Sequence, residues 1–267
     1  MKSLCEKYRP ATLSDLRGHN LIQRQLASFC RKPTSKAFIF AGVPGAGKTS
    51  AAYCIARELG CDMEQRPLAC GGCFEIASGE LTAETVREMF RTTLAYRPFF
   101  GSGWKVLICN EADAMSKQSE IIFLDILEHL PEKTVVIFTT NEAANMSARF
   151  KQRCELHTFK TPVKDFGQGN GDCEIAAQAM IDEVWQKELG HNHSPRLGDL
   201  DGWRDGGNLS FRSVLQALEP LIRLQREDDE LAAQKPVAEI IPALPVNDRI
   251  AAIRAERERA ANFFATA

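Results

Sequence analysis

The chain has no surplus of basic residues: 33 lysines and arginines face 35 acidic residues, and the net charge is −2. Any contact with nucleic acid would therefore need a local basic patch or an assembly of several chains. The first ten residues lack the apolar core of a signal peptide. No apolar run approaches the roughly 18 residues of a membrane helix. These absences predict a protein that is neither secreted nor embedded in a membrane.

A disulfide framework is also missing. The nine cysteines are scattered through apolar stretches, as at Cys54 and Cys109. This distribution is typical of reduced thiols in a cytosolic compartment. The length of 267 residues suits one large domain or two smaller ones.

A phosphate-binding loop is the most specific motif that is present. Residues 42–49 read Gly-Val-Pro-Gly-Ala-Gly-Lys-Thr, a complete G-x-x-x-x-G-K-T pattern. A strand-like apolar run precedes the loop and helix-forming residues follow it, so backbone N–H groups and a helix N-terminus would point at one anion. Lys48 would reach the β- and γ-phosphates of a nucleoside triphosphate, and Thr49 would bind Mg²⁺. The predicted binding residues in this stretch are Gly42, Pro44, Gly45, Ala46, Gly47, Lys48, Thr49 and Ser50.

Strand-like runs alternate with helical patterns between residues 20 and 160. The runs cover 37–41, 74–77, 105–109, 134–139 and 155–159. This alternation predicts an α/β fold with a parallel sheet and helices on both faces. Thr82 is expected to cap one helix, and Ser116 a second that ends near Leu130. The apolar stripe of the second helix widens to nearly all sides, which predicts a buried helix.

The chain changes character after residue 163. Residues 164–172 have the composition of a linker, and only helical patterns follow, at 173–189, 196–204 and 209–219. From Leu221 onward the chain is charged, and a last helix is predicted over 247–264. We therefore expect a nucleotide-binding domain over residues 1–162, a small helical lid domain over 163–220 and a charged helical tail over 221–267.

Polar residues follow two of the predicted strands. Asn110, Glu111 and Asp113 come after one, and Asn141 follows another. Ligands of parallel sheets bind at the carboxyl edge, where such strand ends meet. Glu111 is the candidate for the residue that polarises an attacking water; otherwise it is a surface carboxylate in a turn. Asn141 would bind water or a γ-phosphate oxygen.

An ordered set of motifs resembles the clamp-loader AAA+ ATPases, of the replication factor C small-subunit and bacterial DNA polymerase III tau/gamma kind. Lys7-Tyr-Arg-Pro10 with Gly18-His19 resembles the family's K-Y-R-P…G-Q opening. The phosphate loop follows, and then Ala77-Ser78 with Val86-Arg87. Asn110-Glu-Ala-Asp113 with Leu127-Glu128 resembles D-E-A-D…L-E-E, and Gln152-Arg-Cys154 resembles S-R-C. The resemblance covers roughly residues 4–220.

The resemblance implies a role for each matched residue. It implies ATP and Mg²⁺ as cofactors, with Tyr8 and Arg9 near the adenine and phosphates. Glu111 would be the catalytic glutamate, and Asn141 the sensor of the γ-phosphate. Arg153 would be an arginine finger that enters the ATP site of a neighbouring subunit. The implied partners are other clamp-loader subunits, a sliding clamp and primer–template DNA. The implied compartment is the cytoplasm of a bacterial or phage-infected cell, or a eukaryotic nucleus.

The sequence departs from the family pattern at several positions. Asn110 stands where an aspartate normally organises Mg²⁺ beside Thr49, which predicts weaker metal binding and slow hydrolysis. The lid motif G-D-M-R-R is replaced by Gly207-Asn-Leu-Ser-Phe-Arg212, so that Arg212 would substitute for its arginine. Asp125 occupies a position that is usually basic in the family.

Two further departures concern whole modules. Cys61, Cys70 and Cys73 have the spacing of the bacterial zinc module, but its fourth ligand would fall on Ile76. A structural zinc site needs four ligands, so we expect none to be bound. The residues after Pro220 are too few for the family's helical collar, and the tail is expected to be a reduced collar or a partner-binding segment.

The leading hypothesis is therefore a clamp-loader-like ATPase subunit in DNA replication. A second is a scaffold subunit that holds ATP and lends Arg153 to a neighbour without hydrolysing ATP itself. Another AAA+ replication ATPase, such as a helicase loader, and a small-molecule kinase remain as further alternatives.

Overall fold

The computed structural model describes residues 2–64, 71–92, 94–161, 171–190, 193–200 and 209–234. Short 3₁₀ turns lie at Leu13–Asp15, Ser78–Glu80, Ala112–Ala114, Ala143–Asn145 and Leu197–Asp199. The other elements are, in chain order, α1 (Leu4–Lys7), α2 (Asn20–Arg31), β1 (Lys36–Ala41), α3 (Lys48–Glu58), β2 (Cys73–Ile76), α4 (Ala83–Thr92), β3 (Lys105–Cys109), α5 (Lys117–Glu128), β4 (Thr134–Thr140), α6 (Ala148–Gln152), β5 (Glu155–Thr158), α7 (Gly171–Leu189) and α9 (Phe211–Gln234).

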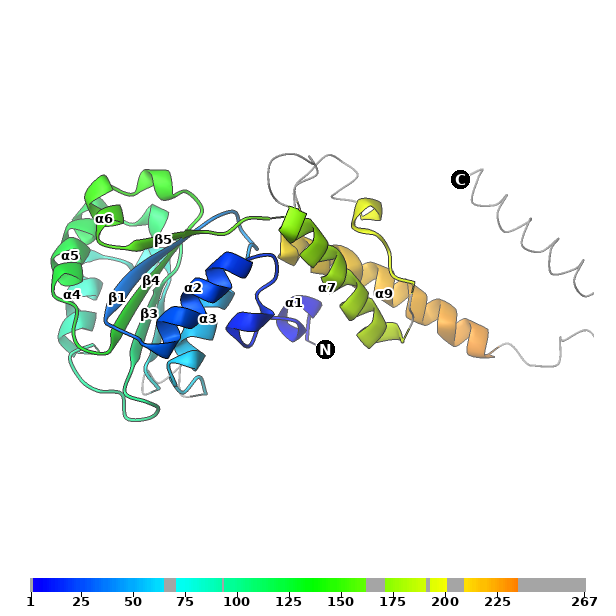
Figure 1. Ribbon diagram of the computed structural model, residues 1–267, viewed down its shortest axis with the longest axis horizontal. Helices are drawn as coiled ribbons and strands as arrows, with labels where there is room; N and C mark the ends of the chain where they lie inside the picture. The colour runs from blue at the N-terminus through cyan, green and yellow to red at the C-terminus, as the bar shows by residue number, and fades with distance from the viewer. Residues whose placement is uncertain are drawn as a thin grey trace, which may run out of the picture. The chain divides into compact units, whose positions relative to one another are not determined.

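The five strands form one parallel sheet in the order β2-β3-β4-β1-β5 (Figure 1). This confirms the predicted α/β fold, and each predicted strand lies within one residue of its observed ends. In the register, Phe38 of β1 lies opposite Ile137 of β4, and Leu107 of β3 lies opposite Val136. The carboxyl ends of β1, β3 and β4 therefore meet at one edge of the sheet, where the phosphate loop begins.

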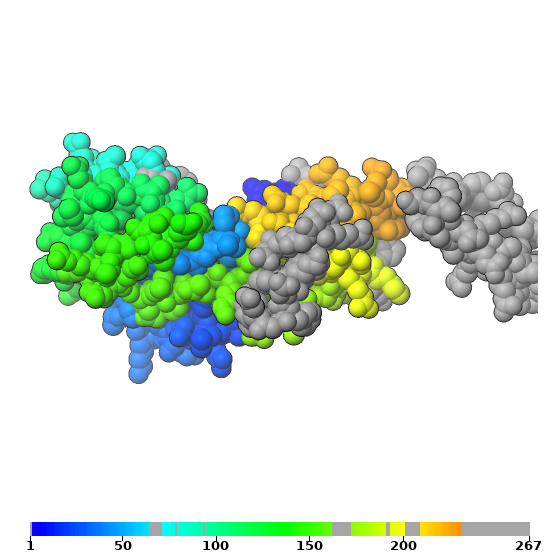
Figure 2. Space-filling view, turned by 90° about the horizontal axis from the view of Figure 1, so that it is seen from above, coloured from blue at the N-terminus to red at the C-terminus, as the bar shows by residue number. Residues whose placement is uncertain are grey.

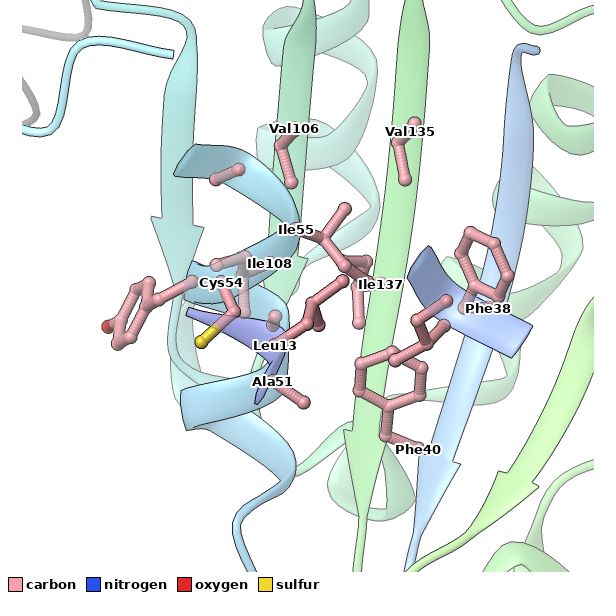
Figure 3. Packing of buried hydrophobic residues seen from close by; sticks show 14 of the residues in the cluster. Leu13, Phe38, Phe40, Ala51, Cys54, Ile55, Val106, Ile108, Val135 and Ile137 are labelled. Carbon is pink, nitrogen blue, oxygen red and sulfur yellow. The ribbon is translucent and has the colours of Figure 1, made fainter. Parts of the chain in front are cut away.

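Alternating side chains of the strands bury the two faces of the sheet separately. Phe38, Phe40, Ile108 and Ile137 pack against Ile55 of α3 and its neighbours (Figure 3). The opposite face packs under α4, α5 and α6. Figure 2 agrees with this layering: the blue residues of α2 lie on one side and the cyan residues around α4 on the other. The nucleotide-binding part is thus a three-layer sandwich.

The predicted helix caps are present, but the predicted burial of α5 is wrong. The amide of Thr85 donates to the Thr82 hydroxyl, and the amide of Ser119 donates to that of Ser116. Only Ser119 and Phe123 of α5 are buried, and Ile121 is 65 % exposed. The helix covers an outer face of the sheet, so one side of its apolar surface remains in contact with solvent.

The helical segment after residue 170 has its own apolar core. Met180, Ile181 and Val184 of α7 pack with Val214 and Leu218 of α9, and Leu4 of α1 joins them. Helix α9 runs on through Pro220 to Gln234, whereas the sequence predicted an end near residue 219. Of the predicted helix 196–204, the described residues show only a short 3₁₀ turn.

Contacts divide the chain into one unit, Met1–Ile222, and a second, Arg223–Ala267. The predicted boundaries at 162 and 220 stay predictions. Residues 164–170 of the predicted linker and the predicted helix 247–264 lie outside the described residues. Within the part that the structure describes, no helix combines the length and the apolar character needed to cross a membrane.

Candidate nucleotide-binding site

The phosphate loop connects the end of β1 to the start of α3. Gly47 lies directly before α3 with a φ of 101°, in the left-handed region that favours glycine. A Cβ built on Gly47 would meet no heavy atom within 4 Å, so the backbone here faces open space. Helix α3 therefore presents its first N–H groups at an accessible, electropositive helix end.

The Lys48 side chain folds back over the loop that precedes it. Its amine donates to the carbonyl oxygens of Gly42 and Val43, the latter at 3.0 Å, and to Asn141 Oδ1 at 3.0 Å. The pKa of Lys48 is lowered from 10.5 to about 8, mainly by burial; Asp113 and Glu111 raise the pKa, and Arg212 lowers it. An anion that enters the site would stabilise the charged form of this amine.

A chain of polar side chains continues from Thr49 across three strands. The hydroxyls of Thr49 and Thr139 both donate to Asn110 Oδ1, at 3.3 and 3.0 Å. The amide nitrogen of Asn110 donates to Glu75 Oε1 at 2.6 Å. The ends of β2, β3 and β4 thus meet at the first turn of α3, because these strands are neighbours in the sheet.

Glu111 and Asn141 lie beside this network at the same edge. Glu111 follows β3 in a left-handed conformation with a φ of 53°, and its backbone N–H donates to the Thr139 hydroxyl at 3.3 Å. The backbone N–H of Asn141 donates to Asp113 Oδ1 at 3.3 Å. A non-glycine residue with positive φ is uncommon, and such residues often mark functional sites.

The start of α9 closes the loop from the other side. A Cβ on Gly45 would lie 2.4 Å from the Ser210 hydroxyl and 2.8 Å from Cβ of Arg212. His19 Nε2 lies 3.0 Å from the carbonyl oxygen of Ala46, and its ring contacts Phe211 at a centroid distance of 6.0 Å. Burial lowers the pKa of His19, so its imidazole is the neutral donor to that carbonyl.

These elements line a cavity of about 570 Å³. Most of the residues predicted to bind nucleotide lie on its wall, namely Tyr8, Arg9, Pro44, Gly45, Ala46, Gly47, Lys48, Thr49, Ser50, Asn110, Glu111, Asn141 and Arg212. Tyr8 also donates its hydroxyl proton to Glu188 of α7 at 2.8 Å, and the Arg9 guanidinium lies 6.0 Å from the ring centre of Tyr53.

Two predicted site residues do not line this cavity. Gly42 lies behind the loop, where a Cβ would be 2.3 Å from the carbonyl oxygen of Phe159. Arg153 caps the C-terminal end of α6, forms an ion pair with Glu128 and donates to the Arg149 carbonyl oxygen at 3.2 Å. Its predicted role as a finger for a neighbouring subunit stays a prediction.

The cysteines that have the spacing of the bacterial zinc module are only partly described. Cys61 and Cys73 are buried, and burial raises the pKa of Cys61 to about 12, with a smaller contribution from Cys73. Cys70 lies outside the described residues. Among the residues that the structure describes, no group of three or more His, Cys, Asp and Glu side chains is arranged to hold a metal ion.

The site fits a nucleoside triphosphate with a divalent cation. The open cradle at Gly47 and the buried Lys48 amine suit a polyphosphate. The Thr49 hydroxyl and the Asn110 amide oxygen lie 3.3 Å apart, and oxygen ligands are what Mg²⁺ prefers.

The parallel sheet, the phosphate loop and the polar strand ends have the arrangement of a P-loop nucleotide-binding domain. Residues 38–162 match the family described as ATPase family associated with various cellular activities (AAA). Replication factor C subunit 3 of Blastobotrys adeninivorans is 29% identical over 178 residues, 66% of this chain and 51% of that protein. The replication factor C small subunit of Haloarcula marismortui is 29% identical over 66% of this chain and 53% of that protein.

Among solved structures, the fold is similar to a DNA polymerase III gamma subunit-related protein from Thermotoga maritima. The TM-score is 0.51 at 16% identity, covering 76% of this chain and 61% of the other. The chain therefore contains an AAA ATPase domain whose relatives include replication factor C small subunits, as the motifs predicted. This domain implies nucleotide binding. The chain spans about half the length of the curated relatives it matches.

Sequence reasoning missed several residues of the site. Glu75, Thr139 and Ser210 all lie against predicted site residues, but none of them was predicted to belong to the site. Glu75 carried a signal, because it is the one charged residue in the apolar run of β2. Ser210 carried none, since its approach to Gly45 depends on how α9 packs on the loop.

Proposed function

We propose that this protein is a clamp-loader-like ATPase subunit of DNA replication. It binds ATP with Mg²⁺ and, within an oligomer, helps to place a sliding clamp on primer–template DNA. One observation carries the proposal: Lys48, Thr49, Glu111 and Asn141 lie around one cavity at the carboxyl edge of a sheet in a chain similar to replication factor C small subunits. Its place of action would be the bacterial cytoplasm or a eukaryotic nucleus.

The geometry supports a division of roles among the cavity residues. The N–H groups before α3 and the Lys48 amine would hold the β- and γ-phosphates, while Thr49 and Asn110 would hold the metal. Glu111 would orient the attacking water, and Asn141, already bonded to Lys48, would report the γ-phosphate. Mg²⁺ would supply charge neutralisation of the phosphates.

Two arginines, Arg212 of this chain and Arg153 of a neighbouring subunit, would add positive charge to the site. Arg212 is near enough to Lys48 to affect its pKa, and it would take the part of the lid arginine. Arg153 would serve the cavity of a neighbouring subunit, where an arginine finger contributes about 10³ to 10⁵ in rate.

Calorimetry of the full chain with ATP tests the proposal directly. We expect ATP binding that is strengthened by Mg²⁺ and abolished by Lys48→Met, with Lys32→Met, at the exposed residue that follows α2, as a control. Recovery of a sliding clamp and sister subunits from the native host, by co-purification and mass spectrometry, tests the biological role. A helicase in their place would favour a helicase loader, and absence of ATP binding would exclude the proposal.

Asn110 favours a scaffold subunit as the second candidate, because its amide brings no charge to the metal. The two candidates differ in which residues turnover needs. A catalytic subunit loses turnover with Glu111→Gln. In the assembled complex, a scaffold keeps turnover with Glu111→Gln but loses it with Arg153→Ala.

A further inference from the structure

Glu75 lies beside the position where the usual metal-organising aspartate is replaced. It belongs to β2, and the backbone N–H of Asn110 donates to the Ile76 carbonyl oxygen at 2.9 Å, which continues the β2–β3 pairing. Cys73, Phe74 and Ile76 of this strand are buried, whereas Glu75 is exposed and lines the nucleotide cavity. The strand therefore places a carboxylate at the end of β3.

The hydrogen bonds of Asn110 have a defined polarity. An ionised carboxylate only accepts hydrogen bonds, so the Asn110 amide must turn its nitrogen toward Glu75. The bond between these groups is 2.6 Å long, and the amide oxygen then faces the hydroxyls of Thr49 and Thr139. Without Glu75 the amide nitrogen of Asn110 loses this acceptor, and the amide can turn its oxygen away from Thr49.

The charge at this position is displaced rather than lost. Asn110 with Glu75 carries one negative charge, the same as a single aspartate at position 110 would carry. The Glu75 carboxylate contacts the amide nitrogen of Asn110, whose oxygen contacts Thr49, and groups that hold a metal's ligands in this way orient and polarise them.

We propose that Glu75 is a positioning residue for the divalent cation bound with nucleotide. It holds the Asn110 amide oxygen toward that cation and supplies the negative charge that Asn110 lacks. The inference rests on the proposed function, and it replaces the expectation of weak metal binding with metal binding that depends on Glu75.

Exchanging the charges between the two positions separates this role from a merely structural one. Glu75→Gln removes the charge and lets the amide turn. Asn110→Asp alone places two carboxylates in direct contact, and their repulsion offsets the benefit of the new charge. The double variant Glu75→Gln/Asn110→Asp restores one charge and one hydrogen bond with the roles reversed.

The experiment measures Mn²⁺ binding by electron paramagnetic resonance, using the full chain with a non-hydrolysable ATP analogue. Glu75→Gln should weaken Mn²⁺ binding by about 10- to 100-fold. The double variant should recover most of this loss, and Asn110→Asp alone should gain little. Glu80→Gln is the matched control, because Glu80 is exposed, lies on the same segment and is absent from the cavity wall. Analogue binding in EDTA should be the same for all variants.

Two results would overturn the inference. The first is that Glu75→Gln binds Mn²⁺ as tightly as Glu80→Gln. The second is that Asn110→Asp changes the Mn²⁺ affinity by the same factor in the wild type and in Glu75→Gln. If the wild type bound analogue and Mn²⁺ normally, the proposed nucleotide site would survive either result. If the wild type bound no analogue at all, the proposed function would fail as well.

Discussion

Lys48 shows how much of the site's chemistry depends on one side chain. Its amine is surrounded by carbonyl and amide oxygens, yet burial still lowers its pKa to about 8. A polyphosphate close to the amine would favour the charged form and raise the pKa again. The nucleotide-free and nucleotide-bound proteins should therefore hold different numbers of protons above pH 8 or so.

We predict that nucleotide binding takes up a proton in alkaline solution. Above the pKa of about 8 the free protein has lost the Lys48 proton, and binding must restore it, so affinity falls as pH rises. Below that pH the amine is charged in both states, and affinity is independent of this group. Calorimetry in two buffers with different heats of ionisation measures the uptake, which should approach one proton about one pH unit above the lowered pKa.

The buried thiol of Cys54 would not contribute to this proton uptake. Burial raises its pKa to about 11, so it would remain protonated over the same pH range. Tight binding without proton uptake above pH 8 would contradict the prediction.

Contacts between elements decide the shape of the phosphate loop as much as its own sequence does. Ser210 lies directly before α9 and accepts a hydrogen bond from the Ser213 amide at 3.1 Å, as a helix cap does. This same serine lies against Gly45. The start of α9 therefore packs on the loop that would hold the phosphates, and Gly45 has to lack a side chain for two reasons, its backbone conformation and this contact.

Two alanine substitutions separate those reasons. Gly45→Ala and Gly47→Ala both place a side chain at positive φ, 80° and 101°, and each should cost roughly 1–2 kcal/mol. Only the first meets another residue, so it should lower the free energy of unfolding by a further 1–3 kcal/mol or so, as overpacking does. Chemical denaturation of the nucleotide-free protein measures both, and equal losses would show that α9 does not press on the loop.

At the scale of elements, the sequence predicted the sheet well and the helical segment less well. The central strands β1, β3 and β4 are buried on both faces and read as apolar runs, which is why the sequence shows where they begin and end. The extent of α9 was missed because Pro220 and the charges after Leu221 indicated an end. A proline removes the hydrogen bond of its own nitrogen and its ring crowds the preceding turn, yet α9 continues through Pro220 to Gln234. The burial of α5 was overestimated, because composition alone does not reveal what covers a helix.

One predicted site residue, Arg153, concerns the assembly of whole chains. Arg153 lies outside the cavity of its own chain and is paired with Glu128, whose side chain is 47% exposed. A surface ion pair of this kind contributes about 0 to 1 kcal/mol, so a neighbouring subunit that offers phosphate charge can draw the arginine away.

Mixing two inactive variants tests this arrangement. Glu111→Gln leaves Arg153 intact, and Arg153→Ala leaves Glu111 intact, so each should hydrolyse ATP at least 10-fold more slowly than the wild type on its own. A mixture should regain activity, because subunits next to one another combine an intact Glu111 with an intact Arg153. Steady-state ATPase of the co-assembled chains measures the recovery.

The control mixes Arg153→Ala with the double variant Glu111→Gln/Arg153→Ala, in which no pair of neighbours combines both residues. Recovery in this control, or its absence in the test mixture when co-assembly is verified, would contradict a finger that acts between subunits.

Local patterns in the chain were enough to predict the parallel sheet, the phosphate loop and the grouping of Lys48, Thr49, Glu111 and Asn141 around one cavity. These features depend on local patterns and on the rule that parallel strands bring their carboxyl ends to the same edge. The further side chains that join them could be identified only from the packing of distant segments. Glu75 reaches Asn110 because β2 pairs with β3, and Ser210 reaches Gly45 because α9 packs on the loop. Contacts between segments so far apart in the chain depend on strand order and helix packing, which local patterns do not encode.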